Sequence, residues 1–191
     1  MDSLFSTYFK LGYQHILDIN GYDHIVFVIA LCAIFTLADW RKVAILVTAF
    51  TVGHSLTLAL AVYDVLRFSS DFIETLIPIT ILITCLMNVF FAKKAFYTKI
   101  NFHYWLALFF GFIHGMGFSN FLRAAMLPNE KSIVGKLFAF NLGLELGQLI
   151  IVGFILLLGY LMTKVVKLPQ REWTVFVSGI AFGIATILLL G

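Results

Sequence analysis

The chain has 191 residues, of which 61% are hydrophobic and only 12% are charged. A soluble domain carries about twice that share of charge, because a surface in water needs charged side chains and a surface in lipid excludes them. The net charge of +3 is spread over loops without a long basic run, so the composition argues against a disordered chain and against a nucleic-acid partner.

Six stretches are long and apolar enough to cross a bilayer as helices, which takes about 20 residues each. The joints between them are short and polar, which predicts antiparallel neighbours in a single bundle. We therefore expect an all-α, polytopic membrane helix bundle that forms one domain over residues 1–191. The predicted spans are about 24–39, 42–63, 72–91, 103–123, 136–163 and 173–190.

Residues 1–22 precede the first span and do not resemble one. Phe5 and Phe9 alternate there with Lys10, His15 and Asp18. This mixture predicts a short amphipathic helix that lies at the membrane interface or caps the bundle. The segment also lacks the basic start and clean apolar stretch of a cleavable signal peptide, so we expect the mature chain to begin at Met1.

The distribution of lysine and arginine residues over the loops predicts the orientation of the bundle in the membrane. With the N-terminus outside, eight of the 13 Lys and Arg residues lie in loops on the cytoplasmic side and five on the outer side. Because cytoplasmic loops are enriched in these residues, we expect both termini outside. The expected location is the bacterial inner (cytoplasmic) membrane.

Ionisable residues within the apolar stretches are costly and need a partner. His54, His114 and Glu145 each lie roughly 12–14 Å below the same membrane face if the helices alternate in direction. Asp23 and His24 enter from that face at the start of the first span. The sequence thus predicts one polar site in the outer half of the bundle.

Three imidazoles with one or two carboxylates form a common ligand set for a divalent transition metal such as Zn, Ni, Co or Fe. The predicted metal ligands are His24, His54, His114, Glu145, Asp23 and His15. Side chains that could orient these ligands are Glu74, Asn141, Gln148, Ser55 and Ser119. Two alternatives stay open: the histidines bind neighbouring helices without a metal, and His15 lies exposed at the interface. His103, beside Tyr104 and Trp105, fits an interfacial role.

Five stretches of this sequence together resemble the second branch of the HupE/UreJ family, small membrane proteins found with hydrogenase and urease accessory systems. They are residues 15–27, 50–58, 72–77, 110–119 and 140–148. The resemblance covers about residues 11–150. It implies a nickel or cobalt permease or a metal-handling accessory role, and it implies metal contact for His15, Asp23, His24, His54, His114 and Glu145.

Three functions fit these residues. The first is a divalent metal permease or metal-handling accessory protein. The second is a metal-dependent intramembrane hydrolase of a lipid or peptide, with metal-bound water as nucleophile and Glu145 or Asp23 as general base. The third is a structural or sensory membrane subunit. Whether the chain is an enzyme stays open, and no catalytic residue is assigned. The expected partners are the bilayer, a divalent metal ion, and a membrane protein or second copy of the chain.

Overall fold

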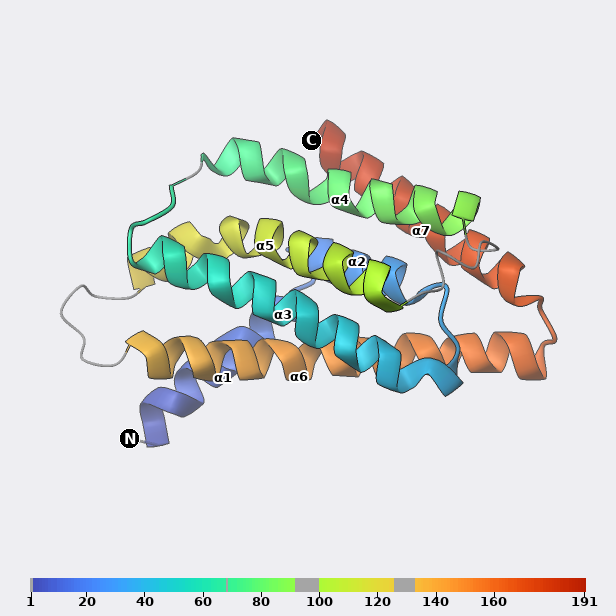
Figure 1. Cartoon of the computed structure of the whole chain (residues 1–191), viewed down its shortest axis with the longest axis horizontal. Coiled ribbons are helices and arrows are strands. Elements are labelled where there is room, and N and C mark those ends of the chain that lie inside the picture. Colours follow the sequence, from blue (N-terminus) through green and yellow to red (C-terminus); the bar gives the residue numbers. More distant parts are fainter. Residues whose placement is uncertain (1, 68, 92–99, 126–132) are drawn as a thin grey trace.

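The computed structural model describes residues 2–67, 69–91, 100–125 and 133–191. These residues form helices joined by short loops, with no strand among them (Figure 1). The elements are α1 (Asp2–Ile16), α2 (Asp23–Cys32), a 3₁₀ turn η1 (Leu37–Asp39), α3 (Trp40–Val62), α4 (Ser70–Phe91), α5 (Ile100–Ala125), α6 (Ile133–Tyr160), a π turn η2 (Leu161–Val165) and α7 (Gln170–Leu190). The prediction of an all-α bundle is confirmed.

Within the described residues, four segments are long and apolar enough to cross a membrane: Leu37–Val62, Ser70–Phe91, Ile133–Val165 and Gln170–Leu190. Large apolar side chains point outwards from the helices, with Phe90 69% and Phe154 67% exposed. Such a surface suits lipid and not water. The helices indicate a membrane protein, but the predicted count of six spans is not confirmed, because α5 falls outside the four and α2 has only 10 residues.

The predicted first span, residues 24–39, is wrong at its C-terminal end. The helix stops at Cys32, and a capping box starts the next helical segment four residues later. Thr36 Oγ1 donates to Asp39 Oδ2 over 2.8 Å, and the same carboxylate oxygen accepts from the Thr36 backbone N–H over 3.2 Å. Asp39 therefore opens the segment that leads into α3 and does not close α2.

The short helix α2 ends inside the protein, where its free carbonyl groups need donors. Ala30 O accepts from Asn88 Nδ2 on α4 over 2.7 Å as well as from the Ala33 N–H over 3.3 Å, and the Thr174 hydroxyl on α7 lies 2.9 Å from both Ala33 O and Gln170 O and shares its one hydrogen between them. Both side-chain donors are buried. These two side-chain hydrogen bonds make a ten-residue helix acceptable in an apolar environment.

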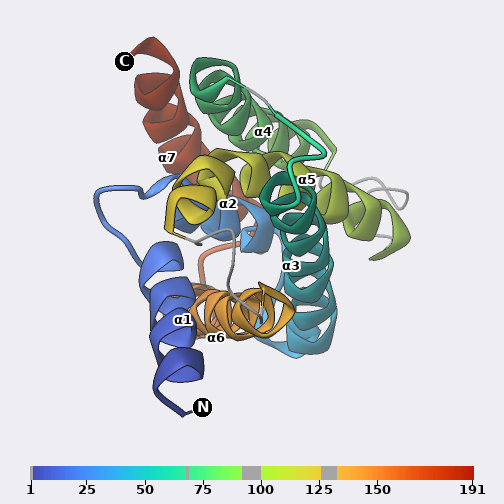
Figure 2. The same ribbon diagram turned by 90° about the vertical axis from the view of Figure 1, so that its left-hand side faces the viewer.

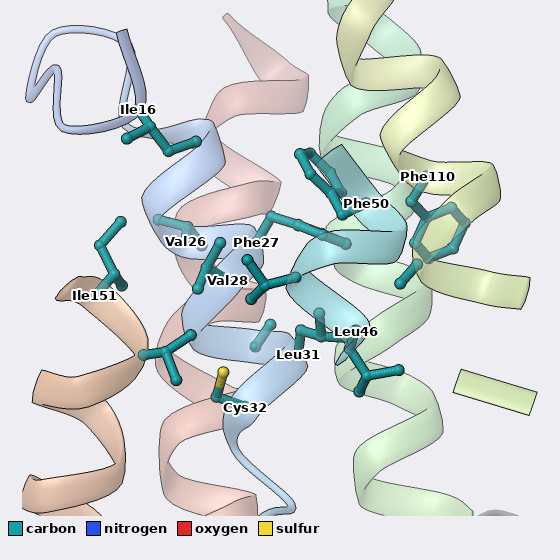
Figure 3. Close-up of a cluster of buried hydrophobic side chains, with 14 of the residues drawn as sticks. Ile16, Val26, Phe27, Val28, Leu31, Cys32, Leu46, Phe50, Phe110 and Ile151 are labelled. Atoms are coloured by element: carbon teal, nitrogen blue, oxygen red, sulfur yellow. The ribbon is translucent and has the colours of Figure 1, made fainter. Parts of the chain in front are cut away.

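Apolar side chains from several helices surround α2 and form the core (Figure 3). Phe27 and Leu31 of α2 pack beside Leu46 and Phe50 of α3, and Phe110 of α5 completes this side. All five are buried. The core thus fixes α2, whose first turn belongs to the candidate site.

The predicted N-terminal helix is present as α1, and it packs along α6 (Figure 2). Glycine permits this contact, because an added Cβ would lie 1.9 Å from Phe140 O at Gly12 and 2.0 Å from Phe9 O at Gly143. Backbones that approach this closely hold α1 against the bundle. The end of α1 is thereby brought to the interior, where Ile16 is fully buried.

Candidate metal centre

Four histidines from four different helices meet in the interior of the bundle. His15 lies in the last turn of α1, His24 in the first turn of α2, His54 in α3 and His114 in α5. His24 is 4% exposed, and both His54 and His114 are fully buried. The sequence predicted one depth for His54 and His114, with His24 entering from the face above; in the structure these three rings lie together, and His15 joins them.

The imidazole rings lie close enough to share one ion. Ring centroids are 4.7 Å apart for His15 and His24, 4.9 Å for His24 and His114, and 6.0 Å for His24 and His54. One nitrogen each from His15, His24 and His54 lies within 4.8 Å of the other two. Three imidazoles at such spacing match the nitrogen ligands that zinc, nickel and cobalt accept.

Each of the four rings has at least one buried nitrogen without a hydrogen-bond partner among the described residues. These atoms are Nε2 of His15, Nε2 of His24, both ring nitrogens of His54 and Nδ1 of His114. Buried polar atoms are nearly always hydrogen-bonded, because leaving one unpaired costs about 1–3 kcal/mol. Unpaired nitrogens on adjacent rings indicate a ligand that His15, His24 and His54 have in common, with His114 beside His24.

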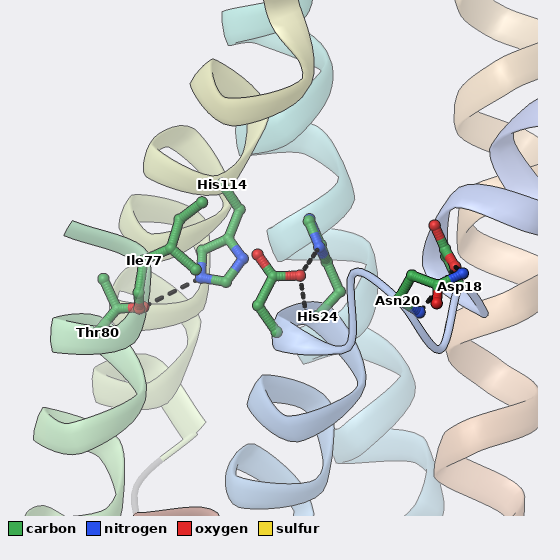
Figure 4. Close-up of polar contacts among 7 residues, drawn as sticks. Asp18, Asn20, His24, Ile77, Thr80 and His114 are labelled. Carbon is green, nitrogen blue, oxygen red and sulfur yellow. Dashed lines mark hydrogen bonds and ion pairs between the residues drawn. The ribbon is translucent and has the colours of Figure 1, made fainter. Parts of the chain in front are cut away.

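Hydrogen bonds orient two of the rings (Figure 4). His24 Nδ1 donates to Asp23 Oδ1 over 2.9 Å, so Nε2 keeps its lone pair. Thr80 Oγ1 donates its only hydrogen to Ile77 O over 2.7 Å and therefore accepts from His114 Nε2 over 3.0 Å. Nδ1 of His114 is then the nitrogen with the free lone pair. Asp23 and Thr80 thus act through the imidazoles, and Thr80 is a site residue that was not predicted from the sequence.

Phenylalanine rings enclose the histidines. Phe118 lies 3.9 Å from His15 between ring centroids, and Phe27 lies 4.8 Å from His114. Phe50 and Phe140 flank His54 at 6.0 and 6.4 Å. These walls limit access of water and fix the ring planes. They looked like ordinary core residues in the sequence.

Two surface cavities adjoin the cluster, because one is lined by His15 and the other by Asp23, the partner of His24. One, of about 500 Å³, is lined by His15 together with Gln14 and Asp18. The other, of about 460 Å³, is lined by Asp23 and Glu74. Carboxylates at both mouths attract cations.

His15 is ready to act as a ligand at neutral pH. Burial, assisted by the neighbouring His24 imidazole, lowers the pKa of His15 from 6.5 to about 3. The ring is therefore neutral at pH 7, and its Nε2 lone pair is free for a metal ion. The position inside the cluster answers the question left open by the sequence, where an interfacial role was equally acceptable.

Comparison with known protein families identifies the family of this chain. The family model described as HupE / UreJ protein matches residues 1–190. The chain belongs to the HupE/UreJ family. This family is associated with nickel and cobalt uptake. Comparison with curated proteins and with solved structures finds no match.

The predicted ligand Glu145 does not join the histidines of this HupE/UreJ protein. Its Oε1 accepts from Thr48 Oγ1 over 2.6 Å, and the side chain is only half-buried. The preceding residue, Leu144, explains the difference, because its side chain is fully buried. One step along a helix turns the side chain by about 100°, so Glu145 points away from the interior that Leu144 faces. Its partner Thr48 also lies six residues before His54 in α3, so the carboxylate is turned away from the histidines and displaced from them by about 9 Å along that helix.

The predicted supporting residues divide into near and distant ones. Asn141 lies beside His54, and its Nδ2 donates to Leu137 O over 2.8 Å. Gln148 accepts instead from the Thr51 hydroxyl. The hydroxyl groups of Ser55 and Ser119 donate to carbonyl groups of their own helices. Glu74 is exposed and lines the cavity beside Asp23. His103 is buried edge-on against Phe35 at 5.6 Å and so does not face lipid headgroups with its ring.

Proposed function

We propose that this HupE/UreJ protein is a divalent metal permease of the nickel and cobalt type. In this proposal His15, His24, His54 and His114 bind the transported ion, and Asp23 orients His24. The observation that carries it is the trio His15, His24 and His54, whose ligand nitrogens lie within 4.8 Å of one another, with unpaired buried nitrogens on these rings and on the neighbouring His114. The proposed ligand set omits Glu145, which faces Thr48.

The interruption between α1 and α2 supports transport. His15 is in the last turn of one helix, Asp23 and His24 open the next, and the chain between them is not helical. Discontinuous helices build ion sites in many transporters, because their ends can shift during access from either side. Neutral imidazoles also bind an ion without trapping it, as conduction requires.

In this proposal the ion enters through the cavity lined by Asp23 and Glu74. A hydrated cation is attracted to Asp23 and Glu74 at its mouth. It exchanges water for the free Nε2 of His24, while Asp23 offsets part of the positive charge through Nδ1–H. His15 and His54 complete the trio whose nitrogens lie within 4.8 Å of one another.

The surroundings of the protein are part of the same proposal. We place it as a single domain in a bacterial inner membrane with both termini outside and the histidine cluster in the outer half. A protein partner or a second copy of the chain fits the same membrane setting.

Uptake into proteoliposomes tests the proposal. Vesicles with an entrapped metal-sensitive dye should take up Ni²⁺ or Co²⁺ with the wild-type protein, and His54→Ala or His114→Ala should reduce uptake about tenfold or more. His103→Gln is the control, because this histidine is packed against Phe35 and belongs to no part of the cluster. Elemental analysis of the same preparations reports the bound metal.

Each result has a clear meaning. Equal uptake and equal metal content in all three variants would rule out a metal site shared by these histidines. One tightly retained equivalent of metal without uptake would favour the hydrolase or the structural subunit over the permease.

A further inference from the structure

A groove of about 670 Å³ opens at the end of the bundle far from the histidines. It lies between η1, the end of α6 and the start of α7. Its lining includes Thr36, Leu37, Tyr160, Lys164, Lys167 and Gln170. Phe140 contacts the histidine cluster and Tyr160 lines the groove, and about 30 Å of helix separates these two residues of α6.

The backbone beside this groove is irregular. Helix α6 ends in a π turn, Leu161–Val165, which carries Lys164. The turn closes with Leu168 N donating to Met162 O over 3.0 Å, and Lys167 adopts a φ of 65°. Glycine is strongly favoured at this position of a helix end, and a lysine there is strained. Strained residues and π turns both occur often at ligand sites.

The lining combines positive charge with apolar surface. Lys164 and Lys167 form no ion pair with any residue that the structure describes, and no acidic side chain lines the groove. Gln170 Nε2 is buried there without a hydrogen-bond partner. Leu37, Tyr160 and Leu168 supply apolar walls. The groove thus offers two cations and an amide donor next to a surface that suits a hydrocarbon chain.

We infer that this groove binds an anionic phospholipid. The headgroup phosphate lies between Lys164 and Lys167 and accepts from Gln170 Nε2, while an acyl chain follows Tyr160 and Leu168. Basic pockets at the cytoplasmic ends of membrane helices bind anionic headgroups in this way. The left-handed backbone at Lys167 then contributes to binding, because it holds the lysine in the wall of the groove.

The test uses the full-length protein in mild detergent with added phosphatidylglycerol, and measures thermal stability and bound lipid by native mass spectrometry. Lipid should raise the melting temperature of the wild type. Lys164→Gln and Lys167→Gly should each weaken lipid binding about fivefold. Lys167→Gly should also keep or raise the melting temperature without lipid, because glycine adopts a φ of 65° freely. That opposite response separates loss of lipid from loss of fold.

Arg171→Gln is the matched control, a neighbouring cation that does not line the groove. It should bind phosphatidylglycerol like the wild type. The proposal is overturned if Arg171→Gln weakens binding as much as the groove variants do, which would indicate general surface charge. It is also overturned if phosphatidylcholine or inorganic phosphate alone stabilises the protein equally, or if both lysine variants bind the lipid normally.

Discussion

The contact between α3 and α5 positions His54 and His114, and Gly111→Ala should disturb it. An added Cβ on Gly111 would lie 2.1 Å from Phe50 O and 2.9 Å from Phe50 Cα, which are backbone atoms that no rotamer change can move. Carbon contacts normally begin at about 3.5 Å, so the two helices must separate by about 1 Å. Overpacking of this kind costs about 2 kcal/mol, which corresponds to a fall of about 4–8 °C in melting temperature.

The matched variant is Gly153→Ala on α6, where an added Cβ meets nothing within 4 Å. Both substitutions gain the same helix propensity, about 0.5–1 kcal/mol, so only the clash distinguishes them. Thermal unfolding in detergent and Ni²⁺ titration calorimetry measure the result. We expect Gly111→Ala to melt lower and to bind the ion about tenfold more weakly, with Gly153→Ala unchanged or slightly more stable. Equal behaviour of the two variants would refute the close contact as the element that positions the histidines.

Three further predictions follow from single contacts. Asp23→Asn should lower metal affinity about 10–100-fold in calorimetry with little change in melting temperature, because the carboxylate orients His24; unchanged affinity would contradict that role. Asn88→Leu should destabilise the protein by about 1 kcal/mol in thermal unfolding, because Ala30 O loses its side-chain donor and keeps only the Ala33 N–H at 3.3 Å, whereas Thr186→Val, whose hydroxyl bonds its own exposed helix, should not. The pKa of His15 is lowered to about 3 in the folded protein, so the unfolded chain binds the extra proton first as pH falls below about 6.5. In the metal-free protein His15 should then contribute a loss of up to about 1.4 kcal/mol of folding stability per pH unit between pH 6.5 and 3, and His15→Gln should reduce the measured slope by that amount.

Properties that depend on position along a helix were accessible from the sequence. The rise per residue is fixed, so the equal depth of His54 and His114 could be worked out before any fold was known. The termini of α4 and α7 also agree with the predicted spans, because Asp71 and Glu172 mark where the apolar stretches begin.

Properties that depend on direction or on distant partners were not accessible. The direction of the Glu145 side chain depends on how α6 packs, and Leu144 takes the buried side. The early end of α2 depends on Asn88 and Thr174, which are remote in sequence from the carbonyls they bind. His15 reaches the cluster only because α1 packs closely on α6. None of these contacts leaves a periodic signal.

The unpaired nitrogens make the metal-free cluster a source of instability, and His54 tests this most directly. Neither of its buried ring nitrogens makes a well-formed hydrogen bond, although Asn141 lies beside the ring, and an unpaired buried nitrogen costs about 1–3 kcal/mol. A ligand that satisfies them stabilises the folded state, by about 2.7 kcal/mol at a concentration 100 times its Kd. His54→Leu, similar in size, should therefore raise the melting temperature of the metal-free protein and abolish the further rise produced by Ni²⁺ or Co²⁺. A purely structural histidine predicts the reverse, a lower melting temperature without metal and an unaltered response to it, and that result would show that the ring is held by packing and binds no ion.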